Sequence, residues 1–128
     1  MLIPVDEAVA RLSKGDLVAL PSETVYGLAG LALKPKSVEA IYSLKGRPST
    51  NPLIVHVCSV EAAEKLAVFS PHAYKLAENF WPGPLTLILP KKDCVPDLVT
   101  AGNPTVALRF PQHPVFLEIL KRLGHPLA

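Results

Sequence analysis

KGRPSTNPLIVH, residues 45–56, runs from a basic loop bounded by proline into an apolar strand that ends at a histidine. Proline disfavours the helical region for the residue before it, so Arg47 is predicted to be extended. If Gly46 is extended as well, Lys45 and Arg47 lie two residues apart and project from the same side of the chain. Two cations in this arrangement suit a polyanion such as a nucleoside triphosphate.

Residues 53–57 are predicted to form a buried strand, because they are β-branched or aliphatic apart from one histidine. Ile54 and His56 would share one face of this strand, and the other three residues would share the opposite face. A histidine that closes an apolar strand beside a cationic loop is a candidate site residue. The alternative is a hydrogen-bonded core histidine beside a solvated loop, and the spacing alone does not decide between the two.

The composition is that of one packed domain. The chain has 128 residues, of which 49% are hydrophobic and 19% charged, which argues against disorder. Its formal net charge of +2 is too small to indicate nucleic-acid binding by itself. The 14 prolines are spread along the chain, mostly beside predicted strands and helix starts, and this indicates stiff loops.

The cysteines, histidines and apolar runs indicate a cytoplasmic protein without a membrane span. Cys58 and Cys94 are far apart in the sequence and form no C-x-x-C motif, so two reduced, buried thiols are predicted. No run approaches the about 18 apolar residues of a membrane span, and no signal peptide is evident. The four histidines lack metal-ligand spacing, so no metal site is predicted.

Helices and strands are expected to alternate along the sequence. Helices are predicted over residues 4–14, 37–44, 60–66, 71–80 and 114–123, with Ser59 and Ser70 as N-caps; strands over 17–20, 28–33, 53–57, 85–89 and 105–110; and the start of a further strand at 125–128. Several connections are too short for helical crossovers. We therefore expect an α/β fold with a twisted, open, mixed parallel and antiparallel sheet flanked by helices.

The strand at residues 105–110 separates into two chemically different faces. Its even-numbered residues are apolar, whereas Thr105, Ala107 and Arg109 form a face with a hydroxyl, a small residue that leaves room, and a guanidinium. An arginine placed there could bind a carboxylate or phosphate with two hydrogen bonds. The alternative is an edge-strand arginine that points into water.

The first polar loop offers three hydroxyls but no recognised catalytic motif. Ser22, Thr24 and Tyr26 could share one side, with Glu23 on the other, although a polar turn without chemistry is the alternative. The sequence contains no glycine-rich phosphate loop and no nucleophile elbow. If ATP binds, side chains rather than a Walker loop would hold it.

Six stretches in a fixed order carry a resemblance to a known family: PSETVYGL (21–28), LKGRP (44–48), NPLIVH (51–56), WPGPLT (81–86), VTAG (99–102) and TVALR (105–109). Each is weak alone, but together they are specific. The chain resembles the YrdC-like family of threonylcarbamoyl-AMP synthases. The resemblance implies an enzyme, a nucleotidyltransferase that makes threonylcarbamoyl-adenylate and pyrophosphate from L-threonine, bicarbonate or CO2, and ATP with Mg²⁺. The product feeds threonylcarbamoyladenosine modification of tRNA, with the transfer performed by other proteins.

The resemblance also implies the roles of individual residues. Lys45 and Arg47 match a pair that would bind the triphosphate and neutralise its charge during catalysis. Asn51 and Thr105 match positions that contact the nucleotide.

The implied amino-acid site consists of three further residues. Thr24 and His56 match positions that contact L-threonine, and Arg109 matches an arginine that would bind its carboxylate. Ser22 stands where threonine is commoner in the family, and its hydroxyl is retained.

Members of the family continue past the Pro-Leu-Ala of residues 126–128 into an A-P-S-A-N segment that completes the nucleotide site. We therefore expect residues 1–128 to be a single YrdC-like domain whose C-terminal part is missing, and an isolated chain of this kind to be inactive.

Two other functions fit parts of the sequence. A non-catalytic RNA-binding module of the same fold could use Lys34, Lys36, Lys45 and Arg47 for RNA or tRNA contact, and its binding would depend steeply on salt. The low aromatic content of 6% speaks against it. A domain handling carbamoyl-adenylate in hydrogenase maturation would normally have acylphosphatase and zinc-finger companions, and neither is expected from residues 1–128.

Overall fold

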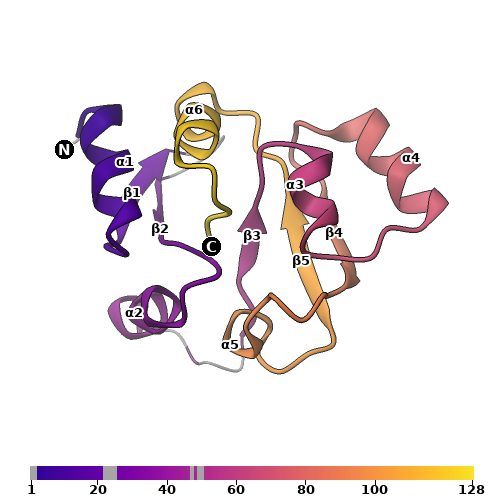
Figure 1. Cartoon of the computed structure of the whole chain (residues 1–128), viewed down its shortest axis with the longest axis horizontal. Coiled ribbons are helices and arrows are strands. Elements are labelled where there is room, and N and C mark those ends of the chain that lie inside the picture. Colours follow the sequence, from indigo (N-terminus) through magenta and orange to yellow (C-terminus); the bar gives the residue numbers. More distant parts are fainter. Residues whose placement is uncertain (1–2, 22–25, 47, 49–50) are drawn as a thin grey trace.

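Helices and strands alternate in the computed structural model, which describes residues 3–21, 26–46, 48 and 51–128 (Figure 1). The helices are α1 (Val5–Ser13), α2 (Pro35–Lys45), α3 (Val60–Glu64), α4 (Pro71–Phe80), α5 (Asp97–Thr100) and α6 (Pro114–Leu123). The strands are β1 (Val18–Pro21), β2 (Tyr26–Ala29), β3 (Ile54–His56), β4 (Thr86–Pro90) and β5 (Thr105–Arg109).

The strands form a two-stranded and a three-stranded sheet. β1 and β2 are antiparallel, and the second sheet has the order β3-β5-β4. β5 runs parallel to β3 and antiparallel to β4, so the predicted mixed α/β fold is confirmed. β5 is the central strand of its sheet. The alternative of an edge-strand position for Arg109 is therefore wrong.

The last residues of the chain connect the two sheets. The backbone N–H of His56 donates to the carbonyl of Leu127 at 2.6 Å, and the N–H of Leu127 donates back to the carbonyl of His56 at 3.1 Å. On the other side, the N–H of Ala128 donates to the carbonyl of Gly30 at 2.9 Å. Figure 1 shows the carboxyl end between β2 and β3. Extended pairing at these residues agrees with the strand predicted to begin there.

Among the described residues, the buried apolar side chains form two cores. Buried residues of α1, α6, β1 and β2 form one core with Leu127. Buried residues of α2, α3 and α4 and of the α5 segment form the other core with the inner face of β3, β4 and β5, including Val55, Leu87 and Leu108.

Local capping signals predicted two helix starts correctly. Ser59 Oγ accepts a hydrogen bond from the N–H of Ala62 at 3.0 Å, and Ser70 Oγ accepts one from the N–H of Ala73 at 3.1 Å. α6 ends at Gly124, which adopts a left-handed φ of 73°.

Several expectations from the sequence need correction. The strand predicted at residues 28–33 is β2, which begins and ends earlier in the sequence, at Tyr26–Ala29. Residues 90–104, for which no helix or strand was predicted, contain the short helix α5. Cys58 is half-buried and Cys94 is exposed, so two buried thiols were a wrong prediction, although both cysteines are free. Cys94 is exposed because it lies in the loop between β4 and α5, where its Sγ donates to the carbonyl of Lys65 at 3.3 Å.

Among the residues that the structure describes, no helix is both long and apolar enough to cross a membrane. The same residues contain no group of three or more histidine, cysteine, aspartate or glutamate side chains arranged to hold a metal ion.

Leu127→Ala is expected to lower the free energy of unfolding by about 2 to 5 kcal/mol, because it removes a fully buried side chain where the two sheets join. Urea denaturation followed by circular dichroism measures the change. Leu44→Ala is the matched control, since Leu44 is 69% exposed and its loss should alter stability by less than about 0.5 kcal/mol. Equal stability of the two variants would contradict the prediction.

Candidate functional site

The outer face of β5 carries the polar side chains that its sequence predicted. Thr105, Ala107 and Arg109 are half-buried, whereas Val106 and Leu108, on the inner face, are buried. The alternation follows from the two-residue period of a strand whose inner face packs on the core. β5 therefore presents Arg109 and Thr105 on the same side of the sheet.

His56 and Arg109 lie level with one another on adjacent strands. They are Cα partners in the parallel pairing of β3 and β5, and the N–H of Val57 donates to the carbonyl of Arg109 at 2.9 Å. Partner residues in a ladder project from the same face. The structure therefore brings together two residues that are 53 positions apart in the sequence (109 − 56 = 53).

Thr86 extends this arrangement onto a third strand. It is the Cα partner of Arg109 in the antiparallel pairing of β4 and β5, and it is half-buried. We call His56, Arg109 and Thr86 the polar row. Sequence reasoning placed Thr86 in a family-like stretch but gave it no role, because only the strand register shows that it lies beside Arg109.

His56 is held between the sheet and helix α6. Its ring centroid lies 4.9 Å from that of Phe116 on α6, with a tilt of 39° between the rings. Backbone hydrogen bonds to Leu127 fix the strand on the other side. His56 is half-buried and lines a cavity, so it combines a packed ring with access to a ligand.

A cavity of about 200 Å³ brings Lys45 and His56 together. Lys45 is the last residue of α2 and is exposed. The cavity extends between β2 and β3, and its lining residues are Gly27, Leu28, Ile41, Lys45, Leu53, Ile54, His56 and Ala128. A cation and an imidazole thus border the same hollow, which suits an anionic ligand.

The predicted geometry of the basic loop is wrong at Gly46. This residue is not extended but left-handed, with φ 62° and ψ 23°, and it ends α2 as a C-cap. The side chains of Lys45 and Arg47 therefore cannot be placed on one side by strand-like alternation through Gly46. The position of Lys45 follows instead from the last turn of α2. Arg47 lies outside the described residues, as does Thr24.

Asn51 lies on a segment that is tied to the core by Tyr42. The carbonyl of Asn51 accepts a hydrogen bond from Tyr42 Oη at 2.9 Å, and the same hydroxyl lies 3.0 Å from the carbonyl of Leu98. The side chain of Asn51 is exposed. The structure therefore fixes the backbone near the predicted nucleotide residue and leaves its amide accessible.

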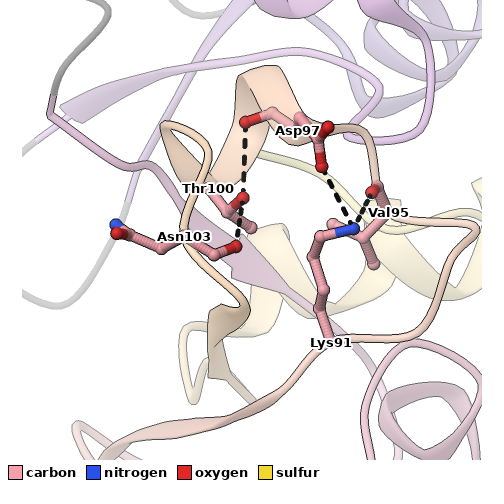
Figure 2. Close-up of polar contacts among 5 residues, drawn as sticks. All are labelled: Lys91, Val95, Asp97, Thr100 and Asn103. Atoms are coloured by element: carbon pink, nitrogen blue, oxygen red, sulfur yellow. Dashed lines mark hydrogen bonds and ion pairs between the residues drawn. The ribbon is translucent and has the colours of Figure 1, made fainter.

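The VTAG stretch has a structural role beside the site. Thr100 is buried, and its Oγ1 lies 3.3 Å from the carbonyl oxygen of Asp97 and 3.0 Å from that of Asn103 (Figure 2). Lys91 Nζ lies 3.1 Å from the carbonyl oxygen of Val95 and 3.3 Å from the Asp97 carboxylate (Figure 2). These contacts hold the turn that leads from α5 into β5 and Thr105.

The same turn also supports the start of β3. The N–H of Leu53 donates to the carbonyl of Val99 at 2.9 Å. Ala101 and Gly102 both adopt left-handed backbone angles, with φ 54° and 78°. Such angles are ordinary for glycine but uncommon for a residue with a side chain, so Ala101 is the unusual position in the reversal that precedes β5.

Known proteins resemble this chain over almost its full length. Residues 10–128 match the Sua5/YciO/YrdC family model, whose description is "Telomere recombination". The threonylcarbamoyl-AMP synthase of Pyrococcus abyssi is 48% identical over 122 residues, which cover 94% of this chain and 36% of that protein. The threonylcarbamoyl-AMP synthase of Bacillus subtilis is 48% identical over 124 residues, covering 95% and 36%.

A solved structure agrees with the fold. The crystal structure of P. abyssi Sua5 complexed with L-threonine superposes with a TM-score of 0.93 at 46% identity, covering 97% of this chain and 37% of that one. The chain thus spans about a third of the length of these relatives. The family match and the conserved fold together confirm the resemblance seen in the six sequence stretches: the chain belongs to the Sua5/YciO/YrdC family.

Proposed function

We propose that this chain carries the L-threonine pocket and part of the nucleotide site of a threonylcarbamoyl-AMP synthase. The proposal rests on the arrangement of three residues. His56 and Arg109 are neighbours on one face of the sheet, and Lys45 lines the same cavity as His56. The names of the 48% identical relatives and the L-threonine complex of the P. abyssi protein support it.

In this proposal the polar row and Thr24 bind the amino acid. The guanidinium of Arg109 has paired donors that match the geometry of a carboxylate, so it would bind that end of L-threonine. His56 and Thr24 would contact the remaining polar groups of the substrate. Because Arg109 is on the central strand, its backbone is fixed from both sides. This preorganisation favours binding of a small zwitterion in a single orientation.

Lys45 and Arg47 would bind the triphosphate, and Asn51 and Thr105 other parts of the nucleotide. Magnesium enters as part of the substrate, the Mg²⁺ complex of ATP, with phosphate oxygens and water as its ligands. Lys45 borders the cavity, and its ammonium would neutralise phosphate charge in the proposed complex.

The proposed reaction needs little acid–base chemistry from the protein. The free amine of L-threonine forms a C–N bond with CO2 and releases one N–H proton to water, and an oxygen of the resulting carbamate attacks the α-phosphorus of ATP. The bond from that phosphorus to the bridging oxygen breaks, and pyrophosphate leaves with its electron pair. Catalysis then rests on positioning the two substrates and on neutralising charge. The adenylate would serve tRNA modification in the cytoplasm, with other proteins performing the transfer.

The first test of this proposal is a calorimetric titration of the chain with L-threonine and D-threonine. L-threonine is expected to bind at least about tenfold more tightly, because a carboxylate clamp plus side-chain contacts distinguishes the enantiomers. Circular dichroism confirms that the protein is folded. A folded chain that binds neither enantiomer, or both equally, would contradict the proposed amino-acid pocket. In a longer protein that carries the A-P-S-A-N segment, pyrophosphate release that depends on L-threonine and bicarbonate then tests the activity.

A further inference from the structure

One buried hydroxyl, that of Tyr42, contacts two segments that are far apart in the sequence. Tyr42 belongs to α2 and is only 6% exposed. Its Oη lies 2.9 Å from the carbonyl oxygen of Asn51, shortly before β3, and 3.0 Å from the carbonyl oxygen of Leu98 in α5. A hydroxyl has a single proton to donate, so the two carbonyls share it. Tyr42 therefore joins the entry to β3 with α5 from inside the core.

A backbone hydrogen bond joins the same two segments one step further along each. The N–H of Leu53 donates to the carbonyl of Val99 at 2.9 Å, and both residues are buried. Figure 1 shows α5 beside the lower end of β3. The hydroxyl and the backbone hydrogen bond together hold residues 51–53 against α5.

The held segment leads into one wall of the cavity that Lys45 borders. Leu53 and Ile54 line this cavity from the β3 side, and Ile41 and Lys45 line it from α2. Tyr42 lies between Ile41 and Lys45 in the helix. The helix that carries Lys45 therefore also carries the hydroxyl that holds the opposite wall, and the spacing between Lys45 and residues 51–53 depends on that hydroxyl.

We propose that Tyr42 is a positioning residue for ATP: its hydroxyl keeps Asn51 at the distance from Lys45 that one nucleotide spans. This inference rests on the proposed function, in which Lys45 contacts the phosphates and Asn51 another part of the same molecule. A ligand that contacts both sides loses affinity when one side must be ordered during binding. Tyr42 itself does not touch the ligand. The L-threonine residues His56 and Arg109 are fixed separately, by the pairing of β3 with β5.

Tyr42→Phe removes the hydroxyl and keeps the ring. Calorimetry is performed with L-threonine and with the Mg²⁺ complexes of ATP and of inorganic tripolyphosphate, which has the phosphates but no nucleoside. The variant should bind ATP about three- to tenfold more weakly, the usual range for one lost hydrogen bond. Tripolyphosphate affinity should change less than about twofold, because this ligand reaches Lys45 without needing Asn51. L-threonine affinity should be unchanged.

Ser37→Ala is the matched control, because it also removes a buried hydroxyl from α2. Ser37 is 1% exposed, and its Oγ donates to the carbonyl of Gly15 at 2.8 Å, away from residues 51–53. Urea denaturation should show similar shifts of the midpoint for the two variants, since each loses one buried hydrogen bond. Ser37→Ala should nevertheless leave all three ligand affinities unchanged.

Amide hydrogen exchange tests the positioning role without any ligand. In Tyr42→Phe, exchange of the Leu53 N–H should accelerate by a larger factor than exchange of the Val57 N–H, which is bonded to the carbonyl of Arg109 in the sheet. In Ser37→Ala the two amides should change by the same factor, because only the global stability is lowered.

Unchanged ATP affinity in folded Tyr42→Phe would overturn the inference and leave the proposed function intact. Equal losses for ATP and tripolyphosphate would do the same, as would an equal loss of ATP affinity in Ser37→Ala or equal acceleration of the two amides in Tyr42→Phe. If the unmodified chain binds neither phosphate ligand, the nucleotide half of the proposed function fails, and the positioning role fails with it.

Discussion

Replacing Arg109 with alanine is expected to weaken L-threonine binding by about a hundredfold or more, because the substrate carboxylate would lose a charged, two-point hydrogen-bonding partner. Arg109 is half-buried on the central strand, so water would replace the guanidinium only in part. Calorimetry with L-threonine measures the loss. ATP affinity should change little, since Arg109 belongs to the polar row and the residues proposed to bind the phosphates are Lys45 and Arg47.

Two further variants make this result specific. Arg109→Lys keeps the positive charge but loses the planar guanidinium with its two parallel N–H donors, so it should recover only part of the affinity for L-threonine. Arg11→Ala is the control for a lost arginine, because Arg11 is an exposed residue of α1 that is paired with Glu7. A similar loss of threonine and ATP binding in folded Arg109→Ala would argue against a carboxylate clamp and for a general structural role.

Lys45→Ala is expected to lower the affinity for the Mg²⁺ complex of ATP by about ten- to a hundredfold, because one charge-assisted contact to the triphosphate is lost. Binding of tripolyphosphate should fall by a similar factor, since the contact is to phosphate. In a longer protein that carries the A-P-S-A-N segment, adenylate formation, followed as pyrophosphate release, should slow by at least as much, because phosphate charge grows on the leaving group. L-threonine affinity should be unchanged.

The control for Lys45 lies in the same helix. Lys36 is an exposed residue in the first turn of α2, at the opposite end from Lys45. Lys36→Ala removes the same charge from the protein, so it reports any effect of net charge on binding. Equal effects of the two substitutions would show that Lys45 acts only through the overall charge and does not contact the phosphates.

The sequence by itself determined the local structure around the site. Ser70 followed by proline predicted the start of α4, and the alternation in TVALR predicted which face of β5 carries Arg109. These signals depend on neighbours in the chain: a cap hydroxyl reaches an N–H three residues later, and strand side chains alternate with a period of two. The six ordered stretches also identified the family, which the comparisons confirmed.

Only the tertiary structure decided which of these residues meet. The register of β3, β5 and β4 places His56, Arg109 and Thr86 in one row, and it leaves Ile88 exposed beside them. The left-handed turn at Gly46 likewise replaced the extended geometry expected for the basic loop. The physical reason is that register between distant strands follows from how two apolar cores pack, and no local pattern in the sequence encodes that packing.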